Sequence, residues 1–222
     1  MCFLSIFKKN NTLETVEIKE KGIEVSKQLI TQKIWYKIMK YNNSFHKGEN
    51  RPVENITYAE ALKFCNLLSK KENLMPVYSE EYIKKWEKAN NSNNLIVNLL
   101  NSSVDIKNSE GYRLPTEEEW LSFLGYTDFF EIEDISWNAK NSNNETHEVG
   151  QKNANEFGIF DMIGNVWEWC DCMIAKGHCY SDYLTNIEEI REAKIEEIKN
   201  SSKIGFRVVK NFKLKVYDEY IF

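Results

Sequence analysis

The sequence predicts an α+β domain that is rich in loops, with short antiparallel strands and a few helices. Three observations lead to this class. Residues 12–25 alternate apolar and polar side chains around Gly22, which is typical of two short strands joined by a turn. Residues 31–40 and 56–74 repeat apolar side chains at helical spacing. Segments dense in Asn and Ser, such as residues 90–94, separate the periodic stretches and indicate loops.

Each predicted element has its own local signals. The expected strand pair buries Val16, Ile18, Ile23 and Val25. Thr31 can cap the first helix, which presents Ile34, Trp35, Ile38 and Met39 on one face. Thr57 and Glu60 have capping-box spacing at the start of the second helix, whose expected buried side is Ala61, Leu62, Phe64, Cys65 and Leu68.

The middle and end of the chain predict further elements. A helical stretch with a tryptophan lies within residues 79–108. Thr116 can cap a helix whose first turn holds three glutamates, where the helix dipole favours acids, and Trp120 and Phe123 should face the core. Residues 183–200 predict a charged amphipathic helix, and 203–209 and 213–222 look like strands.

Composition limits the function classes. The 222 residues fit one domain, 1–222, and 42% hydrophobic content is enough for a core. The formal net charge is −5 and no basic stripe stands out, so nucleic acid is not an expected partner. No apolar run approaches the ~18 residues of a membrane span, so we expect no membrane contact. The short N-terminal apolar run precedes its lysines, unlike a secretory signal, which favours a cytoplasmic protein with five reduced cysteines.

Several blocks, in order, resemble one family. They include GYRLPTEEEW at 111–120, GNVWEW at 164–169 and GFR at 205–207. Together they are similar to the formylglycine-generating-enzyme, or sulfatase-modifying-factor, domain over residues 23–172 and 203–209, whereas 183–200 diverges. The resemblance implies a C-type-lectin-like fold with long ordered loops. Such loops need internal anchors, and we expect Arg113 and Arg207 to be buried clamps on carboxylates or carbonyls.

A calcium site is the first candidate site. Asp161 and Glu168 bracket a glycine turn, and calcium takes carboxylate and carbonyl oxygens. The resemblance implies that Asp161, the carbonyls of Gly164 and Val166, and Glu168 hold the ion. We therefore expect calcium to raise the melting temperature, and we expect Glu168→Ala to abolish that rise. The alternative is a turn held by Asp and Glu hydrogen bonds, with the tryptophans at 167 and 169 in the core.

The resemblance also implies an oxidase that converts a substrate cysteine to formylglycine with copper(I) held by two cysteines between WEW and GFR. Here Cys179 falls on the position of a serine and no cysteine follows it, so copper is not expected. The remaining catalytic candidates are Cys170, Cys172 and Cys179. With His178 they are also a candidate zinc or copper cluster, although the spacing is not a standard one and buried structural cysteines are the alternative.

The sequence gives no sign that the two other histidines are catalytic. His46 lies in a polar loop and His147 precedes an expected strand, and both should be surface or hydrogen-bonded residues. The function hypotheses are therefore a non-catalytic binding or accessory module, with a protein, peptide or small molecule as ligand, and an oxygen-dependent oxidase with a rearranged thiol pair. A remnant that folds but does little is the third.

Overall fold

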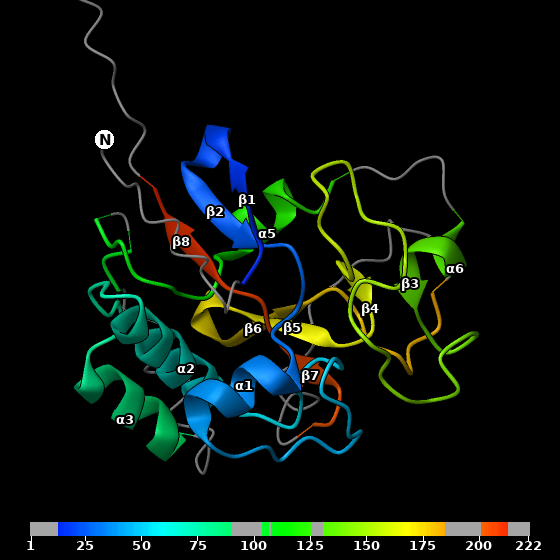
Figure 1. Cartoon of the computed structure of the whole chain (residues 1–222), viewed down its shortest axis with the longest axis horizontal. Helices are drawn as coiled ribbons and strands as arrows, with labels where there is room; N and C mark the ends of the chain where they lie inside the picture. The colour runs from blue at the N-terminus through cyan, green and yellow to red at the C-terminus, as the bar shows by residue number, and fades with distance from the viewer. Residues whose placement is uncertain (1–12, 90–103, 107, 126–130, 185–200, 213–222) are drawn as a thin grey trace, which may run out of the picture.

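The computed structural model describes residues 13–89, 104–106, 108–125, 131–184 and 201–212 (Figure 1). The side chain of Cys172 is also outside the described part. Three expectations therefore fall outside the described residues: the loop at 90–94, the charged helix at 183–200 beyond Leu184, and the strand at 213–222. Within the described ranges, no helix is both long and apolar enough to cross a bilayer.

Short strands form three small sheets. One sheet has the order β1-β2-β8 and is antiparallel, the second pairs β3 with β4 in parallel, and the third has the order β6-β5-β7. In the third sheet, β5 is antiparallel to β6 and parallel to β7. The strands are β1 Thr15–Ile18, β2 Ile23–Ser26, β3 Ser136–Trp137, β4 Ile163–Gly164, β5 Trp167–Cys170, β6 Ile174–Lys176, β7 Ile204–Gly205 and β8 Val209–Asn211.

The predicted helix starts are confirmed. Thr31 Oγ1 accepts a hydrogen bond from the backbone of Ile34, and Thr57 and Thr116 each form a complete capping box. Helices α1 to α3 lie together on one side of the molecule, opposite the β1-β2-β8 sheet (Figure 1). The helices are α1 Gln32–Met39, α2 Tyr58–Lys71, α3 Glu80–Ala89, α5 Glu117–Ser122 and α6 Ile132–Ile135, with 3₁₀ turns η1 Lys19–Lys21 and η2 Asp171–Met173.

Two hydrophobic clusters fill the interior. The first joins the three N-terminal helices to β5 and β7 and includes Trp35, Phe64 and Phe206. The second lies between the β1-β2 hairpin, α5 and β4, and includes Trp120 and Phe123, both fully buried as expected. The polar network of Arg207 described below lies beside both clusters, because β5 contributes residues to each of them.

Three local predictions need correction. The strand expected after His147 is not formed, because Val149 and Gly150 are in a turn whose backbone bonds go to distant loops. The run at 203–209 does not form one strand but divides into β7 and the start of β8 around the buried Arg207. Two pairings, β3 with β4 and β5 with β7, are parallel, which the long intervening connections permit.

Candidate functional site

The GNVWEW and GFR blocks meet in a buried ion pair. Arg207 Nε donates to Glu168 Oε2 at 2.6 Å and Nη2 donates to Oε1 at 2.7 Å, and both side chains are fully buried. Trp120 Nε1 donates to the same carboxylate at 3.0 Å. The guanidinium also donates to the carbonyl of Phe160. Burial raises the pKa of Glu168, and Arg207 opposes that shift. The predicted arginine clamp is confirmed at this position.

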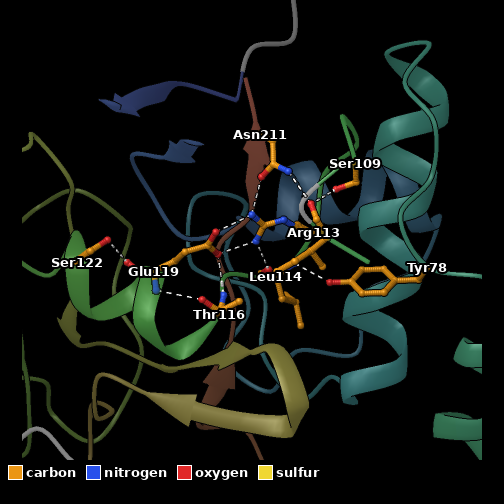
Figure 2. A network of polar contacts seen from close by, with 9 residues as sticks. Tyr78, Ser109, Arg113, Leu114, Thr116, Glu119, Ser122 and Asn211 are labelled. Carbon is orange, nitrogen blue, oxygen red and sulfur yellow. Dashed lines mark hydrogen bonds and ion pairs between the residues drawn. The ribbon is translucent and has the colours of Figure 1, made fainter. Parts of the chain in front are cut away.

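A second clamp ties the GYRLPTEEEW block to the last described strand. Arg113 donates to both carboxylate oxygens of Glu119, at 2.6 and 2.7 Å, and to Asn211 Oδ1 at 2.7 Å. Figure 2 shows Glu119 between Arg113 and Thr116. Its Oε2 also accepts a hydrogen bond from the backbone N–H of Thr116 at 2.9 Å. One glutamate therefore completes the capping box of α5 and neutralises a buried arginine.

The predicted calcium turn is anchored by protein donors. Asp161 accepts from the backbone of Gly150 at 2.7 Å and from Asn165 Nδ2 at 3.3 Å. Asn165 in turn brackets His147, accepting from its N–H and donating to its carbonyl. Gly164 has φ +80°, and a Cβ there would lie 2.3 Å from the carbonyl oxygen of Trp137, so only glycine fits.

This geometry does not fit a calcium ion at both carboxylates as they stand. Each oxygen of Glu168 accepts from Arg207 and each oxygen of Asp161 accepts from a protein donor. A cation at Glu168 would lie beside a guanidinium of like charge and compete with it for the carboxylate. Among the described residues, no group of three or more His, Cys, Asp or Glu side chains is placed to hold a metal. Calcium binding at Asp161, Gly164, Val166 and Glu168 stays a prediction for the titration described in the Discussion.

The cysteine candidates lie apart where they are described. Cys170 belongs to the second hydrophobic cluster and Cys179 to the first, and both are fully buried. Burial raises the pKa of the Cys170 thiol well above its usual value and that of Cys179 to about 12. The His178 ring lies against the Trp167 ring, and its Nδ1 is 3.5 Å from Asp182 Oδ2. Cys170 lies opposite Ile174 at one end of β5, whereas Tyr180, next to Cys179, bonds to Asn165 beyond the other end. The two thiols therefore do not face each other as the paired donors of copper(I) do.

His46 and Glu54 form a polar site that sequence reasoning missed. The His46 ring lies edge-on between Phe45, which is 72% exposed, and Tyr180. Glu54 Oε1 accepts from the backbone of His46 at 2.8 Å. His46 Nε2 and Glu54 Oε2 are buried atoms without a hydrogen-bond partner among the described residues. Burial raises the pKa of Glu54 to about 7. His46 is half-buried and hydrogen-bonded through its backbone, as expected, although its ring Nε2 has no partner among the described residues. The ring of His147 bonds to the carbonyl of Ser142.

A pocket also opens beside this loop, between the exposed face of α1 and residues 42–49. Its volume is about 560 Å³, within the usual range for ligand sites. The lining residues from α1 are Gln32, Lys33, Tyr36 and Lys37. The sequence offered one signal for it, the polar face of the first helix, but no way to place the loop that forms the opposite wall.

Comparison with known proteins identifies the fold and the family. The model of the sulfatase-modifying factor enzyme 1-like domain matches residues 11–212, more than nine-tenths of the chain. The solved structure of Treponema denticola variable protein 1 is 26% identical and superposes with a TM-score of 0.68 over 85% of this chain and 84% of that one. The structure of CarF is 20% identical, with a TM-score of 0.62 over 86% and 87% of the two chains, and it supports the fold alone.

This chain belongs to the sulfatase-modifying factor enzyme 1-like domain family. Among curated proteins, it is 36% identical over 174 residues to the chaperone protein LppX of Paenibacillus barcinonensis, which covers 66% of this chain and 60% of LppX. It is 40% identical over 68 residues to the serine/threonine-protein kinase pkn1 of Chlamydia caviae, covering 28% of this chain and 11% of the kinase. The chain thus spans under two thirds of either relative.

Proposed function

We propose that this protein is a non-catalytic binding or accessory module of its family. The observation that supports this most is the placement of Cys170 and Cys179, fully buried in two different hydrophobic clusters. Copper(I) chemistry of the family's kind needs two soft thiolates that face each other and a substrate cysteine. Both arginine clamps of the scaffold are formed in this chain. Among the described thiols, no two face each other in this way.

The electrostatics of the two cysteines support the same proposal. A thiol reacts and binds metal as the thiolate, and a raised pKa leaves that form scarce at neutral pH. Burial raises the pKa of both thiols, and nearby carboxylates, Glu168 and Asp182, raise it further. A reactive pair needs the opposite surroundings, with positive charge and partial exposure.

A protein is the ligand class that we favour. The relative LppX is named a chaperone protein, which supports a protein as the ligand class. In this chain the exposed rings of Phe45 and Tyr36 offer the aromatic contact area that protein interfaces commonly use. The cytoplasmic location stays a prediction from the sequence.

Two experiments test this function. The first incubates copper-loaded protein and oxygen with a peptide that carries a sulfatase motif, alongside an active formylglycine-generating enzyme as the control. We expect no formylglycine by mass spectrometry from this protein, and conversion above the no-enzyme background would overturn the proposal.

The second experiment measures partner binding directly. Affinity purification from the native host should recover a specific protein, with Phe45→Ser as a matched variant that removes an exposed ring without touching the core. The protein recovered with the parent chain should be depleted with the variant. Recovery of no specific partner, by a chain that remains folded, would contradict the binding role.

A further inference from the structure

One buried carboxylate holds the bend at residues 44–46, which presents the exposed ring of Phe45. Glu54 is fully buried, and its Oε1 accepts a hydrogen bond from the backbone N–H of His46 at 2.8 Å. Ser44 Oγ accepts from the backbone N–H of Glu54 at 3.2 Å and donates to the Glu54 carbonyl at 3.3 Å. The bend is therefore fastened to Glu54 through both its side chain and its backbone.

The bend carries an aromatic surface. Phe45 is 72% exposed, and its ring lies edge-on to that of His46, with the ring centroids 5.0 Å apart. The His46 ring also lies edge-on to that of Tyr180 at 5.0 Å, and the Tyr180 hydroxyl is 3.2 Å from Ser202 Oγ. A movement of the bend would therefore change how Phe45 and His46 pack against the rest of the molecule.

Among the described residues, Glu54 has no ion-pair partner of the kind that both clamp glutamates have. Its Oε2 is a buried atom without a hydrogen-bond partner in the same residues. Burial raises the pKa of Glu54 to about 7, and the backbone N–H groups of His46 and Phe45 and the charge of Lys47 oppose the rise. The carboxyl therefore releases its proton near neutral pH, and the ionised form is the costly one inside the protein.

The two titratable rings at the bend lose their protons outside the middle of the range from pH 6 to pH 8. Burial raises the pKa of Tyr180 above its ordinary value of 10.0, and Lys203 opposes that rise. Burial and the charge of Arg51 lower the pKa of His46 from its ordinary value of 6.5. Of the described groups at the bend whose pKa is shifted, Glu54 is therefore the one that titrates in the middle of this range.

We propose that proton release from Glu54 loosens the bend at residues 44–46 and so controls how the Phe45 ring is presented to a partner. With Glu54 protonated, the bend is closed and Phe45 keeps its packing against His46. An ionised Glu54 gains hydration when the bend opens, so the open state becomes more populated as pH rises. The inference rests on the proposed function for the role of Phe45, whereas the opening itself takes place in the free protein.

Amide hydrogen exchange of the whole chain tests this switch, with mass spectrometry of overlapping peptides from residues 42–50. Exchange is compared at pH 6 and pH 8 after correction for the intrinsic chemical rate. The pKa of Glu54 is about 7 in the closed bend and 4.5 when the carboxyl is exposed, so protection of the bend should fall about tenfold from pH 6 to pH 8. A fall below about twofold in the parent would overturn the proposal, whether or not any variant folds.

Two variants separate Glu54 from the other groups of the loop. Glu54→Gln keeps an acceptor for the backbone of His46 and does not ionise, so its protection should stay constant within about twofold. Glu49→Gln is the matched control, because it removes an exposed acid that pairs with Lys33 in the same loop, and the fall with pH should remain. A fall of the parent's size in Glu54→Gln would overturn the proposal, since other groups would then cause it.

The amides of α2 distinguish local opening from unfolding of the whole chain. The bend should be less protected than α2 at every pH, because it opens while the core stays packed. Equal protection of the two segments would show that the bend opens only on unfolding, and would overturn the proposal. A flat exchange profile in a protein that still recovers a specific partner through Phe45 would refute the switch and leave the proposed function standing.

Discussion

Two regions of the molecule treat a buried carboxylate in opposite ways. In the clamps, Glu168, which is fully buried, and Glu119, which is mostly buried, each bind an arginine through two hydrogen bonds. Just after the loop that walls the pocket, Glu54 is fully buried, yet its Oε2 has no hydrogen-bond partner among the described residues. A buried carboxylate that is paired with arginine holds the scaffold together. One without a charged partner lowers the free energy of unfolding as it ionises with rising pH. The difference separates the part of the molecule that holds the fold from the part next to the candidate ligand surface.

The largest expected effect is from Glu168→Ala. The change leaves the Arg207 guanidinium fully buried without its carboxylate, and breaking a buried pair in this way costs about 3–5 kcal/mol of unfolding free energy. Urea denaturation monitored by tryptophan fluorescence measures it. A loss below about 1 kcal/mol would mean that the clamp contributes little, as exposed pairs do.

Glu119→Ala should cost less, about 1–3 kcal/mol, because the carboxylate is partly solvent-exposed although the variant also loses its capping-box bond. Glu118→Ala is the matched control, since Glu118 is an exposed neighbour on the same helix that pairs only with Lys21 in the described structure. The control should denature at nearly the parent urea concentration. Equal destabilisation by the two variants would refute a special role for the second clamp.

Glu54→Gln should change how stability depends on pH. The folded-state pKa of Glu54 is raised to about 7 from 4.5, so its contribution to stability is fully present below pH 4.5 and is lost as pH rises through 7. Between these values the parent should lose roughly 1–3 kcal/mol from this group. Glutamine keeps the acceptor for His46 and does not ionise, so the variant should lose less.

The pKa values of Asp161 and Glu168 are also raised by burial, so the slope of stability against pH should become shallower in the glutamine variant without vanishing. The measurement is a series of urea curves from pH 5 to pH 8. A variant with the same slope as the parent would show that Glu54 titrates near its ordinary value.

Calcium should produce the smallest effect. Because Arg207 already neutralises Glu168, the clamp geometry predicts that calcium, titrated at fixed ionic strength, leaves the melting temperature of the parent unchanged. A rise in the parent that Glu168→Ala abolishes would instead support the calcium site expected from the sequence.

Local features of the fold were predictable from the sequence. Thr31, Thr57 and Thr116 cap helices as expected, because capping depends on residues three positions apart. Gly22 has φ +65° at the expected hairpin turn, because a left-handed position favours glycine. The long-range fold came from the resemblance, since short strands and long loops carry little periodicity of their own.

The sites were predictable in chemistry but not in pairing. The sequence indicated that Arg207 would bind carboxylates or carbonyls, whereas the family resemblance implied calcium at Glu168, which stays a prediction. Residues 39 positions apart form the pair of Arg207 and Glu168, and nothing local specifies it. Glu54 was missed for a related reason, because its burial depends on the packing of a polar loop that no periodic pattern marks.

Copper(I) affinity tests the central claim most directly. The claim is that this chain keeps the family's scaffold without two thiolates that face each other. The whole reduced protein is titrated anaerobically with copper(I) in the presence of a chromophoric chelator that competes for the ion. The account predicts that the chelator keeps the copper. One equivalent withheld by the parent protein, and released when Cys170 and Cys179 are both replaced by serine, would contradict it.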